Sequence, residues 1–262
     1  MQVEKYKPVG TVIPGGEPKI TFRIIGKCNF HCPSCSTASH PERKGILRFS
    51  HFKKLIEILA QEKFRGVLNI SGGEPSLHPR LIDMLRHAAK NLPEIKIVVF
   101  TNGSWIGKPW WRKKLRSLLT VKNAIIRMSL DRQHAEGARR ASQGEEGLSY
   151  FEDKIFQHAQ SFLSAALSYG AIPGDDFDFA FKGNQNEADL YMARLGKVPV
   201  YCIEFQKNPE IRPKKFGYFG VDIDKQGKPY VFPTLGHILS QEPLGGMETL
   251  STALQMNRDH IK

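Results

Sequence analysis

The chain has 262 residues, a formal net charge of +12 and a hydrophobic content of 40%. This length can bury one substantial core, and the balance of apolar and charged residues excludes a disordered chain. The apolar stretches are strand-sized, far below the roughly 18 residues of a membrane-spanning helix, so we expect no membrane association. The first residues lack the charged-then-apolar layout of a signal peptide, which predicts a cytoplasmic protein with reduced cysteines.

The positive charge favours acidic partners, such as phosphorylated substrates, acidic peptides or nucleic acid. It does not choose among them, because many basic proteins carry only solvated lysines. The segment around Trp105, Trp110 and Trp111 is both basic and aromatic, which is compatible with nucleic-acid contact. A surface helix with an apolar inner side explains it more simply, so nucleic acid is not the favoured partner.

The first half of the chain alternates short apolar segments with longer amphipathic ones. The predicted strands cover residues 20–26, 66–71, 95–100 and 124–130. The predicted helices cover residues 50–63, 80–91 and 110–119. The first of these carries Phe52, Leu55, Ile56 and Leu59 at helical spacing, with Ser50 as its expected N-cap.

The second half of the chain is less regular. Residues 137–149 are rich in Gly, Ser, Arg and Glu, which predicts a loop. A helix follows at 151–169, then a strand at 177–181, a helix at 187–195 and a strand at 198–205. Short strands around 218–222 and 229–232 suggest a closing hairpin.

Strands that alternate with helices in this way are expected to be parallel, with right-handed crossovers. A wound sheet and a (β/α) barrel are both compatible with the pattern. In either fold, functional residues gather where the strands end. The distinctive motifs of this chain follow predicted strands.

Three of the four cysteines lie on one short loop, as Cys28, Cys32 and Cys35 in the spacing Cys-x3-Cys-x2-Cys. A closed zinc or iron–sulfur site needs four protein ligands. Three ligands therefore indicate a metal site with one open position, while a zinc loop would still need a fourth ligand from elsewhere.

The tetrapeptide Gly-Gly-Glu-Pro occurs twice, at residues 15–18 and 72–75. The first copy precedes the first predicted strand and is interpreted as an ordinary turn. The second copy ends the second strand, where Gly72 and Gly73 allow a close approach of backbone to a ligand.

The cysteine spacing together with the strand-end Gly-Gly-Glu-Pro resembles the radical S-adenosylmethionine (radical SAM) enzymes over roughly the first 135 residues. The resemblance implies an α/β fold, a partial (β/α)6 barrel of parallel strands with a short C-terminal extension. It implies an N-terminal segment at 1–19, a core at 20–208 and the extension at 209–262.

In that family three cysteines hold a [4Fe–4S] cluster, and S-adenosylmethionine chelates the fourth iron. Cleavage of the cofactor gives a 5′-deoxyadenosyl radical that abstracts a substrate hydrogen. The resemblance implies Cys28, Cys32 and Cys35 as cluster ligands, with Gly72, Gly73 and Glu74 at the amino group of S-adenosylmethionine.

Three further residues are candidates for cofactor contacts. The family often presents polar side chains to the ribose at the end of the fourth strand, which here implies Ser129 and Asp131. Asp131 could instead cap the following segment. Asn102, after the third strand, is a weaker candidate. The chain departs from the family at Ser34, where an aromatic residue usually packs near the adenine.

The fourth cysteine, Cys202, lies on the predicted sixth strand. It is a candidate hydrogen donor to a substrate radical, although a lone buried cysteine is more often a small core residue. The tail weakly resembles the auxiliary-cluster extensions of peptide-modifying members. Because no cysteine follows Cys202, we expect one cluster.

The resemblance implies an enzyme that cleaves S-adenosylmethionine reductively and modifies a peptide or natural product. A glycyl-radical activating enzyme and a nucleotide-modifying enzyme are alternatives, and an iron–sulfur sensor or scaffold is the non-enzymatic one. The implied partners are a flavodoxin- or ferredoxin-type one-electron reductant and a peptide or small-molecule substrate, acidic or phosphorylated in keeping with the charge.

Overall fold

The computed structural model describes residues 19–142, 145–182, 195, 200–203, 219–233, 245–247, 249–252 and 254. Several predictions fall elsewhere. The N-terminal segment with the first Gly-Gly-Glu-Pro, most of the expected helix at 187–195 and the boundary after residue 208 lie outside the described residues.

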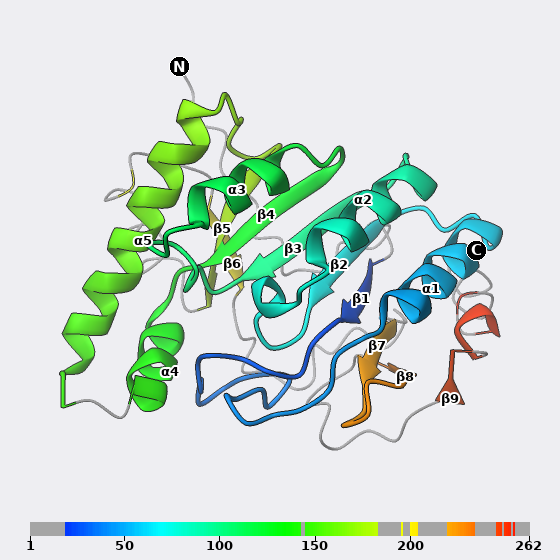
Figure 1. Cartoon of the computed structure of the whole chain (residues 1–262), viewed down its shortest axis with the longest axis horizontal. Helices are drawn as coiled ribbons and strands as arrows, with labels where there is room; N and C mark the ends of the chain where they lie inside the picture. The colour runs from blue at the N-terminus through cyan, green and yellow to red at the C-terminus, as the bar shows by residue number, and fades with distance from the viewer. Residues whose placement is uncertain are drawn as a thin grey trace.

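The described strands form one nine-stranded sheet in the order β6-β5-β4-β3-β2-β1-β7-β8-β9 (Figure 1). The first six strands pair in parallel and in chain order, which confirms the expected alternation of strand and helix. Their bounds are β1 (Lys19–Arg23), β2 (Val67–Ser71), β3 (Lys96–Thr101), β4 (Ala124–Ser129), β5 (Phe177–Lys182) and β6 (Val200–Ile203).

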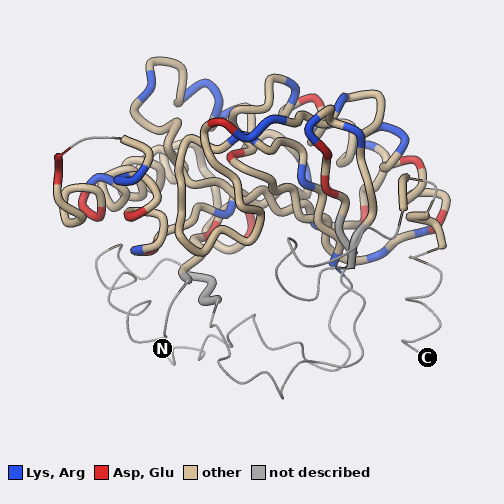
Figure 2. The backbone as a smooth tube through the Cα atoms, turned by 90° about the horizontal axis from the view of Figure 1, so that it is seen from below, with Lys and Arg blue, Asp and Glu red and all other residues tan. Residues whose placement is uncertain are grey.

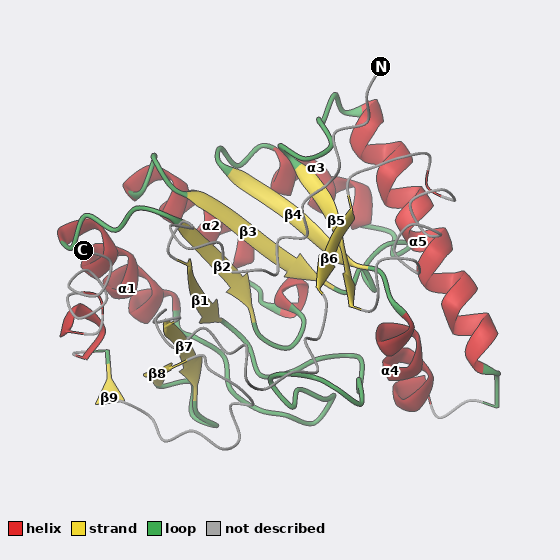
Figure 3. Ribbon diagram, turned by 180° about the vertical axis from the view of Figure 1, so that it is seen from behind, coloured by secondary structure: helices red, strands yellow, loops and turns green. Residues whose placement is uncertain are grey.

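The described helices cover one face of this sheet, and the other face is turned towards the viewer in Figure 3. The helices are α1 (Phe49–Gln61), α2 (Leu81–Asn91), α3 (Trp111–Leu119), α4 (Arg132–Ser142) and α5 (Leu148–Ser168), with a short 3-10 helix, η1 (Pro75–Leu77). The side chains predicted to face inward from α1 are all buried, as expected from their spacing.

Aromatic side chains fill much of the space between sheet and helices. Phe22 of β1 meets Phe52 of α1 edge-on, with ring centroids 6.1 Å apart. Phe162 of α5 packs in the same way against Phe177 and Phe179 of β5. Edge-to-face pairs add to the stabilisation from burial, so these contacts fix the helices on the sheet.

Two local predictions are wrong. Helix α1 begins at Phe49 with Arg48 as its N-cap, so Ser50 lies inside the helix. The expected loop at 137–149 begins instead with the second half of α4. Glu136 pairs with both Arg139 and Arg140 one turn later, and such pairs favour a helix in a polar sequence.

The predicted hairpin exists as β7 (Phe219–Ile223) and β8 (Pro229–Pro233), which pair antiparallel. It does not close the barrel. Strand β7 pairs in parallel with β1, and β8 carries the short strand β9 (Gly245–Gly246), so the hairpin extends the sheet on the side opposite β6. Within the described residues, the fold is a partial barrel of six parallel strands with this hairpin at its β1 edge.

None of the helices in the described part of the chain combines the length and apolar character that a bilayer crossing needs.

Candidate functional site

A cavity of about 390 Å³ lies at the carboxyl ends of β1 to β4. Its size falls in the range of small-molecule sites. The structure places most of the sequence-predicted site residues on its wall, together with several that the sequence did not single out. The predicted residues that line it are Cys28, Cys32, Cys35, Gly72, Gly73, Glu74, Asn102 and Ser129.

The three cysteines lie on the loop between β1 and α1, and none of them forms a disulfide. Within the described residues, no three His, Cys, Asp or Glu side chains are grouped to hold a single metal ion. All three thiols line the same cavity, and thiolates are the protein ligands of iron–sulfur clusters, in which each binds a different iron.

Hydrogen-bond donors surround two of the sulfur atoms. The backbone N–H of Phe30 donates to Cys28 Sγ at 3.4 Å, and Asn102 Nδ2 approaches the same sulfur at 3.7 Å. Such donors stabilise negative charge on sulfur and tune iron–sulfur centres.

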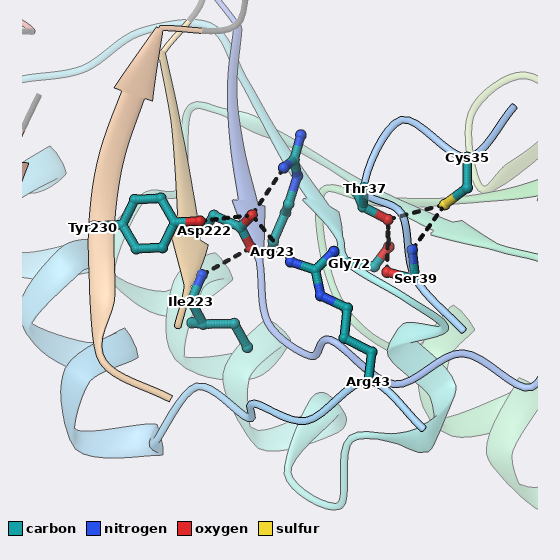
Figure 4. A network of polar contacts seen from close by, with 9 residues as sticks. All are labelled: Arg23, Cys35, Thr37, Ser39, Arg43, Gly72, Asp222, Ile223 and Tyr230. Atoms are coloured by element: carbon teal, nitrogen blue, oxygen red, sulfur yellow. Dashed lines mark hydrogen bonds and ion pairs between the residues drawn. The ribbon is translucent and has the colours of Figure 1, made fainter. Parts of the chain in front are cut away.

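Cys35 Sγ lies 3.1 Å from Thr37 Oγ1 and accepts from the backbone N–H of Ser39 at 3.4 Å (Figure 4). The donor set therefore fits a cluster ligated by these thiols. Burial and the nearby Glu74 charge raise the pKa of the Cys28 thiol to about 12.

The Gly-Gly-Glu turn after β2 is built into the backbone that leads to the cysteines. The N–H of Gly73 donates to the carbonyl of Ile25 at 2.6 Å, and that of Glu74 donates to the carbonyl of Lys27 at 3.0 Å. A Cβ added at Gly73 would overlap the Lys27 carbonyl. The glycines thus allow two backbone segments to approach closely. This role is additional to the ligand contact that the sequence suggested.

The carboxylate of Glu74 is almost fully buried and already bound by three protein donors. One oxygen accepts from Ser76 N–H and Thr101 Oγ1, and the other accepts from Asn102 N–H at 2.7 Å. Glu74 therefore joins the ends of β2 and β3 and fixes the position of Asn102. Its predicted contact with S-adenosylmethionine stays a prediction.

Asp131 does not line the cavity. Its Oδ1 accepts from the backbone N–H of His134 at 3.0 Å, and His134 Nδ1 lies 2.9 Å away. This is the helix-capping role that the sequence offered as the alternative, here at the start of α4. Its ribose contact stays a prediction, while His134 and Ser129 line the cavity wall.

Ser34, where the sequence departs from the family, also lines the cavity. Its hydroxyl donates to Gln133 Oε1 at 3.2 Å, which ties the cysteine loop to the first turn of α4. Nothing in the spacing of the sequence linked these two residues, because the contact joins segments 99 positions apart.

Arg23, at the end of β1, is a cavity residue that the sequence did not suggest. Its NH1 donates to Asp222 Oδ2 of β7 at 3.0 Å, and Tyr230 of β8 donates to the same oxygen at 3.2 Å (Figure 4). Arg43, from the segment after the cysteines, approaches Asp222 at 3.6 Å. Burial lowers the pKa of Arg23, and Asp222 opposes that shift.

A second buried ion pair lies on the same sheet face as Ser129. Arg127 of β4 contacts Asp178 of β5 through two nitrogens, at 2.7 and 2.5 Å. Alternate residues of a strand share a face, so Arg127 lies below Ser129 on the sheet face that the described helices do not cover. Burial raises the pKa of Asp178 although Arg127 acts in the opposite direction.

Cys202 is placed on β6, where its register partner is Phe181 of β5. Phe181 belongs to the core beneath the helices, while the neighbouring pair, Ala180 and Tyr201, continues the register of Ser129. The Cys202 side chain lies outside the described residues, so its role as a hydrogen donor stays a prediction.

Comparison with known proteins finds relatives that match part of this chain. AlbA of Bacillus subtilis (strain 168), an antilisterial bacteriocin subtilosin biosynthesis protein, is 34% identical over 119 residues, or 44% of this chain and 25% of that protein. A GTP 3',8-cyclase of Paenarthrobacter nicotinovorans is 28% identical over 116 residues, 43% of this chain and 31% of the cyclase. The chain thus spans between a quarter and a third of the length of these relatives.

Solved structures share the fold. The anSMEcpe structure with bound AdoMet and Kp18Cys peptide has a TM-score of 0.56 at 14% identity, covering 93% of this chain and 82% of that one. BtrN in complex with AdoMet and 2-DOIA has a TM-score of 0.52, also at 14% identity, covering 94% and 87%.

The model of the radical SAM superfamily matches residues 22–141, which contain the cysteine loop and the ends of β2 to β4. The family uses a [4Fe–4S] cluster and S-adenosylmethionine, and the three thiols of this cavity fit the cluster. Over residues 22–141 this chain is similar to the radical SAM superfamily.

Proposed function

We propose that the chain is an enzyme that cleaves S-adenosylmethionine reductively at one [4Fe–4S] cluster held by Cys28, Cys32 and Cys35. The observation that carries the proposal is that all three thiols line one cavity together with the Gly72–Gly73 turn. A sensor or scaffold needs the metal ligands but not the adjoining wall of turn and strand-end polar groups.

Cys28, Cys32 and Cys35 would hold the cluster, which would supply the electron for reductive cleavage of S-adenosylmethionine, drawn from a flavodoxin- or ferredoxin-type reductant. The residues of the chain hold the cluster and orient S-adenosylmethionine. Asn102 Nδ2 and the backbone N–H of Ser39 present polar hydrogens to Cys28 and Cys35, and so stabilise added negative charge on the sulfur atoms. Ser129 and His134 offer polar atoms on the opposite wall, where the ribose is proposed to lie.

The proposed substrate is a peptide or a peptide-derived natural product. Support comes from the similarity to AlbA, which is named for the biosynthesis of a bacteriocin. A nucleotide is the second candidate, because two further relatives are named GTP 3',8-cyclase and a net charge of +12 suits a phosphorylated substrate. A peptide that stimulates release of 5′-deoxyadenosine, with no stimulation by GTP, supports the first substrate over the second.

Iron content tests the cluster assignment. After anaerobic reconstitution we expect about four irons per chain in the wild type and loss of most of that iron in Cys28→Ala, Cys32→Ala or Cys35→Ala. Cys202→Ala is the matched control and should keep the wild-type iron content. A cysteine-loop variant that retains the full complement of iron contradicts the assignment.

A further inference from the structure

A second cavity, of about 410 Å³, lies on the outer side of the cysteine loop. Asn29 and Phe30 form one wall, directly after Cys28. The loop after β3 forms the second wall, and helices α4 and α5 complete the enclosure. None of the residues that line it belongs to the wall of the first cavity.

Two lysines and a histidine line this cavity. Lys108 comes from the loop after β3, and Lys154 and His158 lie one turn apart on α5. The described residues that line the cavity include no carboxylate, and neither lysine forms an ion pair with any residue that the structure describes. Burial lowers the pKa of His158, and Lys154 and Lys108 lower it further, so both ammonium groups act on the imidazole.

The remainder of the wall is apolar and well buried. Phe30, Ile106, Phe151 and Ile155 line the cavity and are each less than 10% exposed. An apolar pocket with a few convergent polar groups is the usual form of a small-molecule site. The lining thus offers contacts for an apolar body and separate contacts for an anionic group.

A hydrogen-bonded wall separates this cavity from the first. Asn29 Oδ1 accepts from Asn102 Nδ2 at 3.2 Å and from Ser104 Oγ at 3.1 Å, and Ser104 N–H donates to Asn102 Oδ1. The polar atoms of this wall bond to one another. The ammonium groups of Lys108 and Lys154 are therefore the groups that can bind a negatively charged part of a ligand.

We propose that this second cavity binds a phosphate monoester of a small organic molecule, with the phosphate at Lys108, Lys154 and His158 and the organic body on Phe30, Ile106, Phe151 and Ile155. Two ammonium groups can match the charge of a phosphate, which carries close to two negative charges at neutral pH, and the His158 imidazole can donate a hydrogen bond to it. The site does not depend on the radical chemistry proposed above, since it contains neither cluster ligands nor the Gly72–Gly73 turn.

Isothermal titration calorimetry on the full chain without its cofactors tests the proposal with phenyl phosphate as the probe. We expect saturable binding to the wild type and at least about tenfold weaker binding to the Lys108→Gln/Lys154→Gln double variant, through loss of two charge-assisted contacts. Lys113→Gln, which removes an exposed charge of α3 outside the cavity, should bind as the wild type does.

Two further probes distinguish the parts of the proposed ligand. Inorganic phosphate and benzyl alcohol should each bind at least about tenfold more weakly than phenyl phosphate, because each lacks one half of the contacts. Wild-type affinity of the double variant overturns the phosphate site. Equal affinity for inorganic phosphate overturns the assignment to a monoester, and equal affinity for benzyl alcohol overturns the role of the cations. Failure of these tests leaves the cluster assignment untouched.

Discussion

At Gly73, the absence of a side chain allows two backbone segments of the site to pack closely together. Its backbone lies so close to Lys27 that any larger residue would overlap the carbonyl oxygen. The sequence identified this glycine through its place at the end of β2, but explained it by contact with a ligand. The contact with the cysteine-loop backbone could not be predicted, because it depends on how two distant segments meet.

The repeated tetrapeptide allows this interpretation to be tested. We expect Gly73→Ala to displace the cysteine loop and to lower reconstituted iron content severalfold, because the added Cβ has no room. Gly16→Ala, at the matching position of the first Gly-Gly-Glu-Pro, should leave iron content unchanged. Equal iron losses in the two variants would show that the motif acts through its composition and not through its position.

Asp131 shows the limit of assigning a side chain from its strand alone. The sequence placed it at the end of β4, where the structure also has it, but could not decide between a ligand and a cap. The choice depends on whether a helix begins at residue 132, and the polar sequence of α4 gave no apolar periodicity to predict one. The same omission hid Gln133, which the first turn of α4 brings to the cavity beside His134.

At the scale of elements, apolar periodicity was sufficient to predict a helix where that helix packs on the sheet. The inward face of α1 and the alternation of strands and helices follow from short-range patterns, whereas these patterns left the order of the strands open between a wound sheet and a barrel. The pairing of β7 with β1 could not be predicted in this way, because the residue pattern of a strand does not show which edge of the sheet the strand joins. That pairing is specified instead by contacts between distant side chains, above all Arg23 with Asp222.

Helix α4 packs against the cysteine loop at Gly137, and this contact gives a second prediction. A Cβ at Gly137 would overlap Cys32 Sγ and lie 2.9 Å from Cys32 Cα. In an open helix, Gly→Ala stabilises by roughly 1 kcal/mol, but here we expect Gly137→Ala to lower the free energy of unfolding. Urea denaturation of the cofactor-free chain measures it.

Gly147→Ala is the control for that substitution. Gly147 precedes α5 with an ordinary backbone conformation and only one atom near its added Cβ, at 3.9 Å. We expect its effect on stability to stay within about 1 kcal/mol. A Gly137→Ala variant that is more stable than the wild type would show that α4 does not pack tightly against Cys32.

The β1–β7 junction gives a third prediction. Asp222→Asn removes the negative partner of the buried Arg23 and the partly buried Arg43, and uncompensated buried charge is costly. We expect a loss of about 3 kcal/mol in the free energy of unfolding. Tyr230→Phe removes one hydrogen bond to the same carboxylate and should lose only about 1 kcal/mol. Equal losses in urea denaturation would show that the buried charge is not the main contribution.

At the scale of the whole molecule, the basic residues are spread over many helices and loops (Figure 2). Among the described residues the positive charge is therefore spread out, and the net charge of +12 gives no preference for nucleic acid over a phosphorylated or acidic substrate. The site itself is more informative. The partial barrel brings the ends of β1 to β4 and the cysteine loop to one cavity, as the order of motifs along the sequence predicted.

Anaerobic release of 5′-deoxyadenosine is the most direct test of the central claim. The reconstituted wild-type chain, supplied with S-adenosylmethionine and dithionite, should release 5′-deoxyadenosine, and the Cys35→Ala variant should release none above background. A wild-type chain that carries about four irons yet leaves S-adenosylmethionine intact would contradict the claim that this cavity performs radical SAM chemistry.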